Sequence, residues 1–239
     1  MNEHVRTLSV GAEDIEYEVV ESSDATKARI DVDINHVKVV VPEGRRSVAT
    51  EFIEENADWV LDKKQEVDEY RESAPDRSFE EGEEFPYRGD IYELQVDDVT
   101  YAKIRGRRIL LPENKVSESS IQDVLEEFYR REARGFFEKA VGRYSDEMNV
   151  EYEGIAVRNQ RTRWGSCSPK KNLSFNWRLV MAPEGVLEYV VVHELAHLKE
   201  KNHTDRFWRV VEEHMPEYKQ HANWLKENSV ELIYTEDDL

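Results

Sequence analysis

The stretch VVVHELAHLKEKNH, residues 190–203, places one glutamate and three histidines directly after an apolar run. On an α-helix, side chains four residues apart lie on the same face about one turn apart, so His193 and His197 can direct ring nitrogens at one metal ion. Glu194 lies beside this pair, within reach of a water molecule on the ion. The pattern predicts a helix from about Glu184 to Lys201 that carries a metal-hydrolase site.

A tetrahedral catalytic zinc ion needs a third protein ligand from outside that helix. His203 meets this need if the chain turns back near Asn202, a residue type that tolerates the left-handed backbone conformation. A glutamate of the following segment, Glu212 or Glu213, is an alternative third ligand. The remaining histidines are interpreted as surface or capping groups or carry no signal: His4, His36, His214 and His221.

The alternative to a metal site is a group of hydrogen-bonded core histidines. VLEYVVV, residues 186–192, leads directly into the motif and predicts a buried helix. Two imidazoles and a carboxyl group are costly to bury without a partner, and a metal ion would provide one.

Length and composition limit the class of protein. A chain of 239 residues is long enough for one large domain or two small ones. Its single cysteine, Cys167, excludes an internal disulfide framework. The start MNEHVRTLSV lacks the features of a signal peptide, and no apolar stretch is long enough to cross a bilayer. We therefore expect a cytoplasmic protein without a membrane partner.

The charge balance is strongly acidic, since 52 acidic and 33 basic residues give a net charge of -19. The acids are dispersed, which is typical either of a surface adapted to high salt (a halophilic protein) or of simple solubility. This charge disfavours a nucleic-acid partner, because a duplex would be repelled.

One window, Gly154–Pro183, contains no acid. It predicts a cationic surface just before the histidine motif. A buried sheet segment is the alternative, although buried strands would equally exclude basic residues. The six basic residues of the window are Arg158, Arg161, Arg163, Lys170, Lys171 and Arg178.

The first part of the chain is predicted to be β-rich. RIDVDI (29–34) and HVKVVVP (36–42) form a hairpin in this interpretation, followed by one helix from an N-cap at Ser47 to about Glu72. ESAPDRSFEEGEE (72–84) is interpreted as a linker or long loop, with four short strands after it.

The second part is predicted to begin near Ser117 with a helix whose apolar stripe runs to Met148. LSFNWRLV (173–180) alternates apolar and polar residues and is expected as a strand, either at a sheet edge where an extended peptide could add, or in the sheet interior. Helices from Thr204 and around Trp224 follow, and the acidic tail is expected to be frayed. The sequence shows no internal repeat.

Four segments between residues 161 and 208 resemble the signature of the YgjP-like zinc metallopeptidases, a family related to the SprT-type proteases: RTRWGSCS, NLSFNWRLVMAP, LEYVVVHELAHLKEKNH and RFW. ENADWVLDKK and FEEGEEFPYRGDIYEL in the N-terminal half also resemble that family. The resemblance implies an α+β fold, with a β-rich N-terminal region with one helix over residues 1–112. A zincin-like metallopeptidase domain with a small sheet and the HExxH helix would occupy residues 113–239.

By this resemblance His193, His197 and His203 are zinc ligands and Glu194 is the general base. One residue departs from the better-known zincins with this ligand spacing, which have glycine where this chain has Glu200. The turn between the second and third ligands is therefore expected to be built differently, by extension of the helix toward Asn202.

The chemistry expected of this site is hydrolysis of peptides or unfolded proteins. Three neutral imidazoles leave zinc its full charge, which lowers the pKa of a bound water toward about 7 and polarises a carbonyl. Glu194 would take the proton and pass it to the leaving amine. The candidates for substrate contact are Arg161, Arg163, Asn176 and Arg178, and those for stabilising the oxyanion are Arg163, Arg178, Tyr189 and Tyr218.

Two other functions remain open. A metal-activated water could hydrolyse a nucleotide such as UTP, an activity proposed within the resembled family, with the basic residues of the acid-free window on the phosphates. A SprT-like protease acting on DNA-bound proteins is less compatible with the net charge and with the absence of a finger-like Cys/His cluster from the sequence. A nucleophilic Cys167 is disfavoured, because each nearby histidine is better used as a metal ligand.

Overall fold

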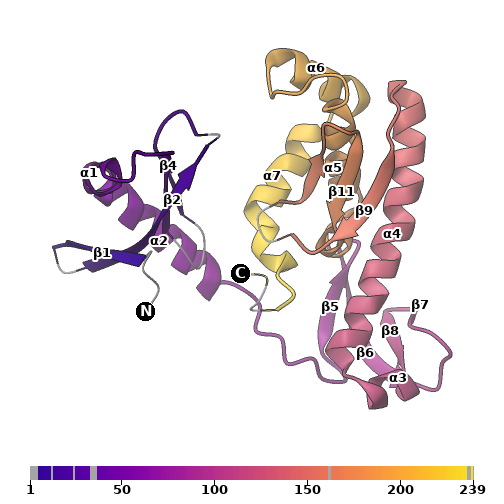
Figure 1. Ribbon diagram of the computed structural model, residues 1–239. Helices are drawn as coiled ribbons and strands as arrows, with labels where there is room; N and C mark the ends of the chain where they lie inside the picture. The colour runs from indigo at the N-terminus through magenta and orange to yellow at the C-terminus, as the bar shows by residue number, and fades with distance from the viewer. Residues whose placement is uncertain are drawn as a thin grey trace. The chain divides into compact units, whose positions relative to one another are not determined.

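The computed structural model describes residues 5–11, 13–23, 25–32, 37–160, 163–235 and 238. The chain separates into two units, Met1–Ala74 and Pro75–Asp238 (Figure 1). Each unit is built around its own hydrophobic core. The histidine motif belongs to the second unit.

The first unit is a four-stranded sheet with two helices. The strands lie in the order β1-β2-β4-β3, with β2 and β4 parallel and the other two pairs antiparallel. Alternation along the strands buries one face, so that Ile15, Val39 and Ile53 are fully buried together. The elements are β1 (Val5–Val10), β2 (Glu13–Ser22), β3 (Arg29–Val32), β4 (Val37–Pro42), α1 (Val48–Glu55) and α2 (Ala57–Glu72).

The predicted hairpin is present in this unit, whereas the predicted single helix is interrupted. The antiparallel pairing of β3 with β4 confirms the predicted hairpin, whose turn lies outside the described residues. The single helix predicted from Ser47 to Glu72 is wrong, because it is broken at Asn56. The Asn56 side-chain amide donates to the Phe52 carbonyl at 2.7 Å and competes with the helical backbone bonds. Ser47 precedes α1 but makes no capping hydrogen bond with its side chain.

The second unit begins with another four-stranded sheet followed by helices. Its order, β5-β6-β8-β7, and its strand directions are those of the first sheet. The two units therefore share a topological repeat, which the sequence analysis missed. The elements are β5 (Glu84–Tyr87), β6 (Asp90–Asp97), β7 (Lys103–Arg105), β8 (Arg108–Pro112), α3 (Glu113–Glu118) and α4 (Ile121–Met148).

Helix α4 is the longest element of the second unit. It starts after Ser120, whose hydroxyl accepts a hydrogen bond from the Asp123 backbone amide at 3.0 Å. Its buried stripe packs in one core with Phe85 and Ile109 of the β5–β8 sheet. The compact units divide at Ala74, inside the region predicted as 1–112, and the predicted domain boundary at residue 112 stays a prediction. That residues 113–239 form the metallopeptidase domain remains a prediction.

A second, three-stranded sheet lies beside the histidine helix. Its order is β10-β11-β9, so β11 is central and β10 is an edge strand. Helix α5 packs against β10, α4, α6 and α7. The elements are β9 (Gly154–Arg158), β10 (Gly165–Cys167), β11 (Asn172–Asn176), η1 (Trp177–Met181), α5 (Glu184–Ala196), α6 (Asp205–His214), α7 (Tyr218–Asn228) and η2 (Ser229–Leu232).

The strand predicted over residues 173–180 is shorter than expected and lies in the interior of its sheet. It ends at Asn176, whose side-chain oxygen accepts from the Arg178 backbone amide at 3.0 Å and starts the 3₁₀ helix η1. Because β11 lies between β9 and β10, the sheet-edge alternative for this strand is wrong. The available edge belongs to β10.

Helix α5 ends earlier than predicted. Its last residue is Ala196, and His197 is the C-cap. The Glu200 backbone amide still bonds to the Ala196 carbonyl at 2.9 Å, after which the chain leaves the helix path. The expected extension toward Asn202 is therefore wrong, and the turn to the third histidine is built from residues 197–203.

The tail predicted to be frayed is partly buried. Tyr234 and Asp238 are 1% and 5% exposed. The Asp238 carboxylate accepts hydrogen bonds from the Asn159 side chain at 2.7 Å and from the Tyr234 and Thr235 backbone amides at 3.2 and 3.1 Å. It also faces the buried Arg178 guanidinium at 3.9 Å. These bonds fasten the tail to the loop that precedes β10.

Asp238→Ala is expected to lower the free energy of unfolding by about 3 kcal/mol, because it leaves the Arg178 charge buried without its carboxylate. Thermal unfolding followed by circular dichroism measures the change. Asp205→Ala, which removes an exposed carboxylate on α6, should alter stability by less than about 0.5 kcal/mol. Equal effects of the two substitutions would contradict a structural role for the buried pair.

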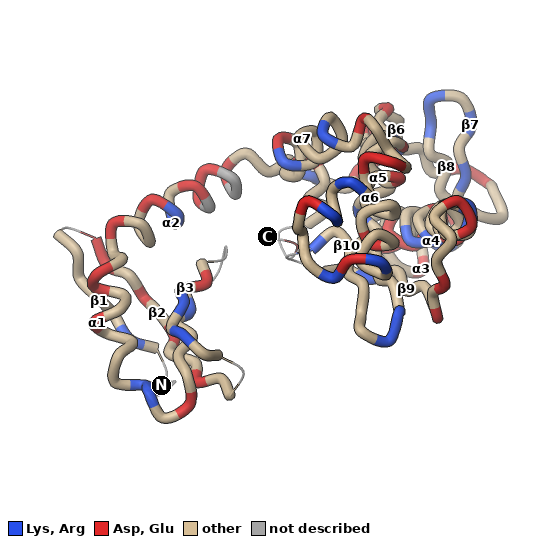
Figure 2. Tube along the Cα trace, turned by 90° about the horizontal axis from the view of Figure 1, so that it is seen from above, with Lys and Arg blue, Asp and Glu red and all other residues tan. Residues whose placement is uncertain are grey.

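Acidic residues are distributed over both units (Figure 2). Within the described chain, every helix is too short or too polar to traverse a bilayer. Because salt screens repulsion between like charges, the melting temperature is expected to be higher in molar KCl than in dilute buffer. Melting curves across a KCl series test this, and a flat or falling trend would contradict adaptation to high salt.

Candidate metal centre

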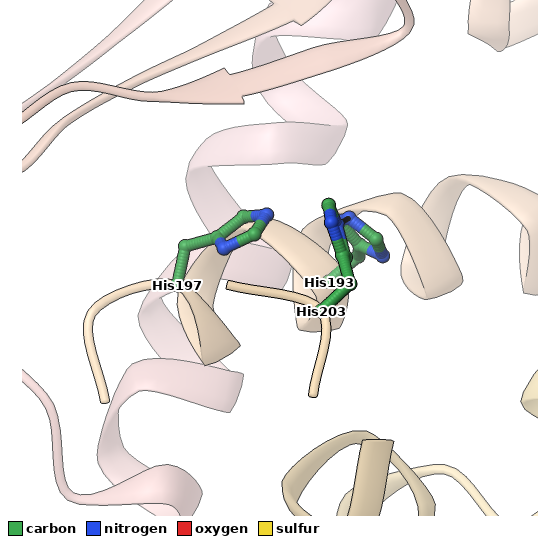
Figure 3. A group of neighbouring side chains, drawn as sticks. All are labelled: His193, His197 and His203. Atoms are coloured by element: carbon green, nitrogen blue, oxygen red, sulfur yellow. Dashed lines mark hydrogen bonds between the residues drawn. The ribbon is translucent and has the colours of Figure 1, made fainter. Parts of the chain in front are cut away.

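Three imidazoles converge at the end of α5. His193 lies in its last turn, His197 caps it, and His203 lies in the segment that leads to α6. One nitrogen from each ring falls within 4.8 Å of the others, and the Nε2 atoms of His193 and His203 are 3.0 Å apart. Figure 3 shows the three rings gathered around one space. The Phe207 ring packs against all three, with centroids 4.6 to 4.9 Å away.

The electrostatics of the cluster suit metal binding. Burial, reinforced by the neighbouring imidazoles, lowers the pKa of His193 to about 3, and burial also lowers the pKa of His197. Both rings are therefore neutral at physiological pH and keep a lone pair for a ligand bond. Two nitrogens on one tetrahedral zinc ion lie roughly 3.3 Å apart, close to the 3.0 Å between His193 and His203.

Glu194 points from α5 toward the edge strand β10. It is 5% exposed, and burial raises the pKa of its carboxyl group to about 7, while the Arg163 guanidinium acts in the opposite direction. A methyl group at Gly165 would lie 2.6 Å from Glu194 Oε1, closer than any normal contact. Only glycine at this position leaves the Glu194 carboxylate its place.

Gly165→Ala is expected to lower the rate of any reaction that uses Glu194 by at least tenfold without removing the metal, because the new methyl group displaces the carboxylate but not the imidazoles. A displacement of about 1 Å can cost 10²-fold in rate. The measurement is kcat and metal content on one sample. Gly135→Ala on α4 is the control, since a methyl group there meets nothing within 4 Å.

The carboxylate and the imidazoles open into a cavity of about 550 Å³. One wall is β10 with the turn after it, and the other is the end of α5 with the segment up to His203. The lining residues are Arg163, Gly165, Ser166, Cys167, Ser168, Pro169, Lys171, His193, Glu194, His197, Leu198, Lys201 and His203.

The residues predicted to contact substrate lie in different places. Arg163 lines the cavity, whereas Arg161 lies outside the described residues. Asn176 and Arg178 are 0% and 3% exposed, and both donate to the Gln160 carbonyl, at 2.7 and 3.0 Å. Neither lines the cavity, and both hold the loop that leads to Arg163, so their contact with substrate stays a prediction that this placement does not favour.

Of the four candidates for stabilising an oxyanion, only Arg163 borders the cavity. Tyr189 packs with its ring 5.8 Å from that of His193, and burial raises the pKa of its phenol to about 12. Tyr218 stacks on Trp208 with centroids 5.4 Å apart. Tyr189 therefore packs against a candidate ligand and Tyr218 against Trp208, and neither lines the cavity.

The alternative third ligands and the alternative nucleophile also have defined positions in the structure. Glu212 and Glu213 are exposed on α6 and, among the described residues, do not belong to the histidine cluster. Cys167 lines the cavity, but burial and the Glu194 carboxylate raise the pKa of its thiol, which opposes nucleophilic use.

The cavity residues that the sequence analysis did not name as site residues include Gly165 and Lys201, and Cys167 was named there only as a disfavoured nucleophile. Gly165 and Cys167 lie in WGSCS (164–168), part of the segment RTRWGSCS that carries the family resemblance. The run of small residues Gly-Ser-Cys-Ser was the available signal, because small side chains allow a strand to approach a catalytic helix closely.

A helix with the sequence His-Glu-Leu-Ala-His and a third histidine beside it is the arrangement of metal-dependent peptidases. A family model of the YgjP-like metallopeptidase domain matches residues 26–228. The chain therefore belongs to the YgjP-like metallopeptidase family, as its motifs predicted. Membership implies a protease that uses a metal ion and acts on peptide substrates.

Two solved structures are similar over part of the chain, both of metallopeptidase zymogens. Abylysin from Pyrococcus abyssi is 22% identical, with 38% of this chain and 93% of that chain covered and a TM-score of 0.35. Jannalysin from Methanocaldococcus jannaschii is 24% identical, with 39% and 96% covered and a TM-score of 0.36. No curated protein matches the sequence.

Proposed function

We propose that the protein is a zinc-dependent metallopeptidase, with His193, His197 and His203 as ligands and Glu194 as general base. The observation that supports this most directly is the convergence of three ring nitrogens within 4.8 Å beside a buried carboxyl group. Three neutral imidazole nitrogens favour zinc over Mg²⁺, which prefers oxygen ligands.

When bound, zinc would supply an activated water and polarise the scissile carbonyl. Glu194 would serve as the group that takes up a proton beside the metal and returns it to the leaving amine. Its raised pKa reflects the cost of burying the charged form, and Arg163 favours the carboxylate needed to accept the proton. Gly165 keeps the carboxylate in place by leaving room for it.

The edge strand β10 offers a way to hold the substrate. Gly165, Ser166 and Cys167 pair with β11 on one side and border the cavity. Their other side pairs with no strand in the described part of the chain. An extended peptide can add there through main-chain hydrogen bonds, which would hold it along the cavity wall beside Glu194 and the imidazoles.

The decisive experiment combines elemental analysis with hydrolysis assays. Purified protein should contain about one zinc per chain, cleave an unfolded protein, lose activity with a chelator and regain it with added Zn²⁺. Restoration by Mg²⁺ alone, or metal-bound protein that cleaves no peptide, would contradict the proposal.

A second candidate is metal-dependent hydrolysis of a nucleotide such as UTP. The exposed cations Arg163, Lys171 and Lys201 around the cavity favour it, because phosphate oxygens bind well to such groups. Release of pyrophosphate from UTP that depends on Glu194, with no cleavage of protein, would select this function.

Proteolysis of DNA-bound proteins is a third candidate, supported only by the resemblance to SprT-type proteases. The net charge of -19 opposes it. DNA retention that persists at physiological salt and falls steeply with added salt would support it.

A further inference from the structure

Three cations line the cavity of the candidate metal centre and, among the described residues, are not engaged in ion pairs. Arg163, Lys171 and Lys201 line the cavity and are exposed. Within the described chain, none of them forms an ion pair. Glu194, the one acid of the lining, is buried at the base of the site. In a protein of net charge -19, such a local excess of positive charge is unusual.

Another cavity of the same unit shows the contrast. It is lined by four cations, and three of them are paired with acids of the same lining. Arg88 lies 3.7 Å from Glu184, and Arg143 lies 2.6 Å from Glu188. Three cations of that cavity thus neutralise neighbouring acids, whereas those of the metal centre remain available to a ligand.

The cations come from three segments and occupy different sides of the site. Arg163 precedes the edge strand β10 by two residues, and Lys171 follows it in the turn to β11. Lys171 is held there in the left-handed conformation, φ 58°, and its backbone amide donates to the Ser168 carbonyl at 2.9 Å. Lys201 belongs to the other wall of the cavity, in the segment that joins His197 to His203.

A peptide paired with β10 would therefore meet a cation at each end of the strand. Three residues of strand span about 10 Å, so Arg163 and Lys171 are spaced to reach side chains on opposite sides of a bond held at the centre. We propose that the site selects peptides with acidic side chains on both sides of the scissile bond, and that Arg163, Lys171 and Lys201 determine this specificity. This inference rests on the proposed peptidase function.

Three fluorogenic peptides with the same scissile bond and flanking Glu, Gln or Lys residues test the inference. At about 0.15 M salt the Debye length is roughly 8 Å, so distant acids are screened but the adjacent cations are not. An exposed ion pair contributes up to about fivefold, and we expect the Glu peptide to exceed the Gln peptide by about tenfold in kcat/KM. The Lys peptide should be the poorest substrate.

Charge reversal, with a matched control, tests whether the preference for acidic peptides comes from the cavity lysines. Lys171→Glu combined with Lys201→Glu should abolish or invert the preference. Lys170→Glu combined with Lys199→Glu changes the net charge equally at exposed neighbours that do not line this cavity, and should preserve it. Equal behaviour of the two double variants would overturn the inference.

Binding provides a readout that does not depend on turnover. Fluorescence anisotropy of the labelled peptides on zinc-loaded Glu194→Gln protein should give the same order of affinities. Zinc-dependent cleavage of the Gln peptide without any acidic preference would overturn the specificity alone. Failure to cleave all three would overturn the peptidase function, and the binding order would still decide the role of the cations. Displacement of bound Glu peptide by UTP, with no preference of Glu over Gln, would assign them to phosphate instead.

Discussion

Glu194→Gln is expected to lower peptide hydrolysis by about 10²- to 10⁴-fold, the range for loss of a positioned general base. The amide has the shape of the carboxyl group and fits beside Gly165, but it cannot accept the proton of the attacking water. The three imidazoles are unchanged, so the metal content should remain that of the wild type. Activity and elemental analysis on the same preparation separate these two properties.

Glu184→Gln is a suitable control, because Glu184 lies in the first turn of α5 and its side chain is exposed. It should retain activity. Turnover of Glu194→Gln near the wild-type level would show that another group accepts the proton, and loss of metal would show that Glu194 acts as a ligand.

His203→Ala is expected to weaken metal binding by more than about 100-fold, the upper value for loss of a partner that only supports a ligand. The substitution leaves two imidazoles on α5 and its C-cap and removes the nitrogen that lies 3.0 Å from His193 Nε2. Competition with a chromogenic chelator measures the affinity, and activity should fall in parallel at limiting zinc.

His214→Ala and His221→Ala are the matched controls, since both remove an imidazole from α6 or α7 that lies outside the cluster. They should bind zinc as the wild type does. Equal affinity in all three variants would move the third ligand to an acid, and Glu212→Ala and Glu213→Ala would identify it.

The sequence predicted the local parts of the site well, because helical periodicity places His193, Glu194 and His197 without knowledge of the tertiary fold. The apolar stripe of α4 was predicted for the same reason. To predict His203 as the third ligand, it was enough to assume that the chain turns back within the few residues after His197. The family was also predicted, since its motifs are contiguous in the sequence.

Features that depend on contacts between distant residues were missed. Gly165 matters because β10 packs against α5, and Asn176 and Arg178 are buried because they bind the Gln160 carbonyl. An alternating pattern cannot distinguish a polar residue that faces solvent from one that satisfies a buried loop. The pairing of Arg178 with Asp238 likewise joins residues far apart in sequence.

The separate cores of the two units have a consequence for how the protein loses its structure. A chain whose apolar side chains form two independent clusters is not required to melt in one cooperative step. Calorimetry would then resolve two endotherms, and Asp238→Ala would move only the one that belongs to Pro75–Asp238. Heat inactivation should follow that endotherm, so the N-terminal unit can melt while the candidate centre in the other unit keeps its metal.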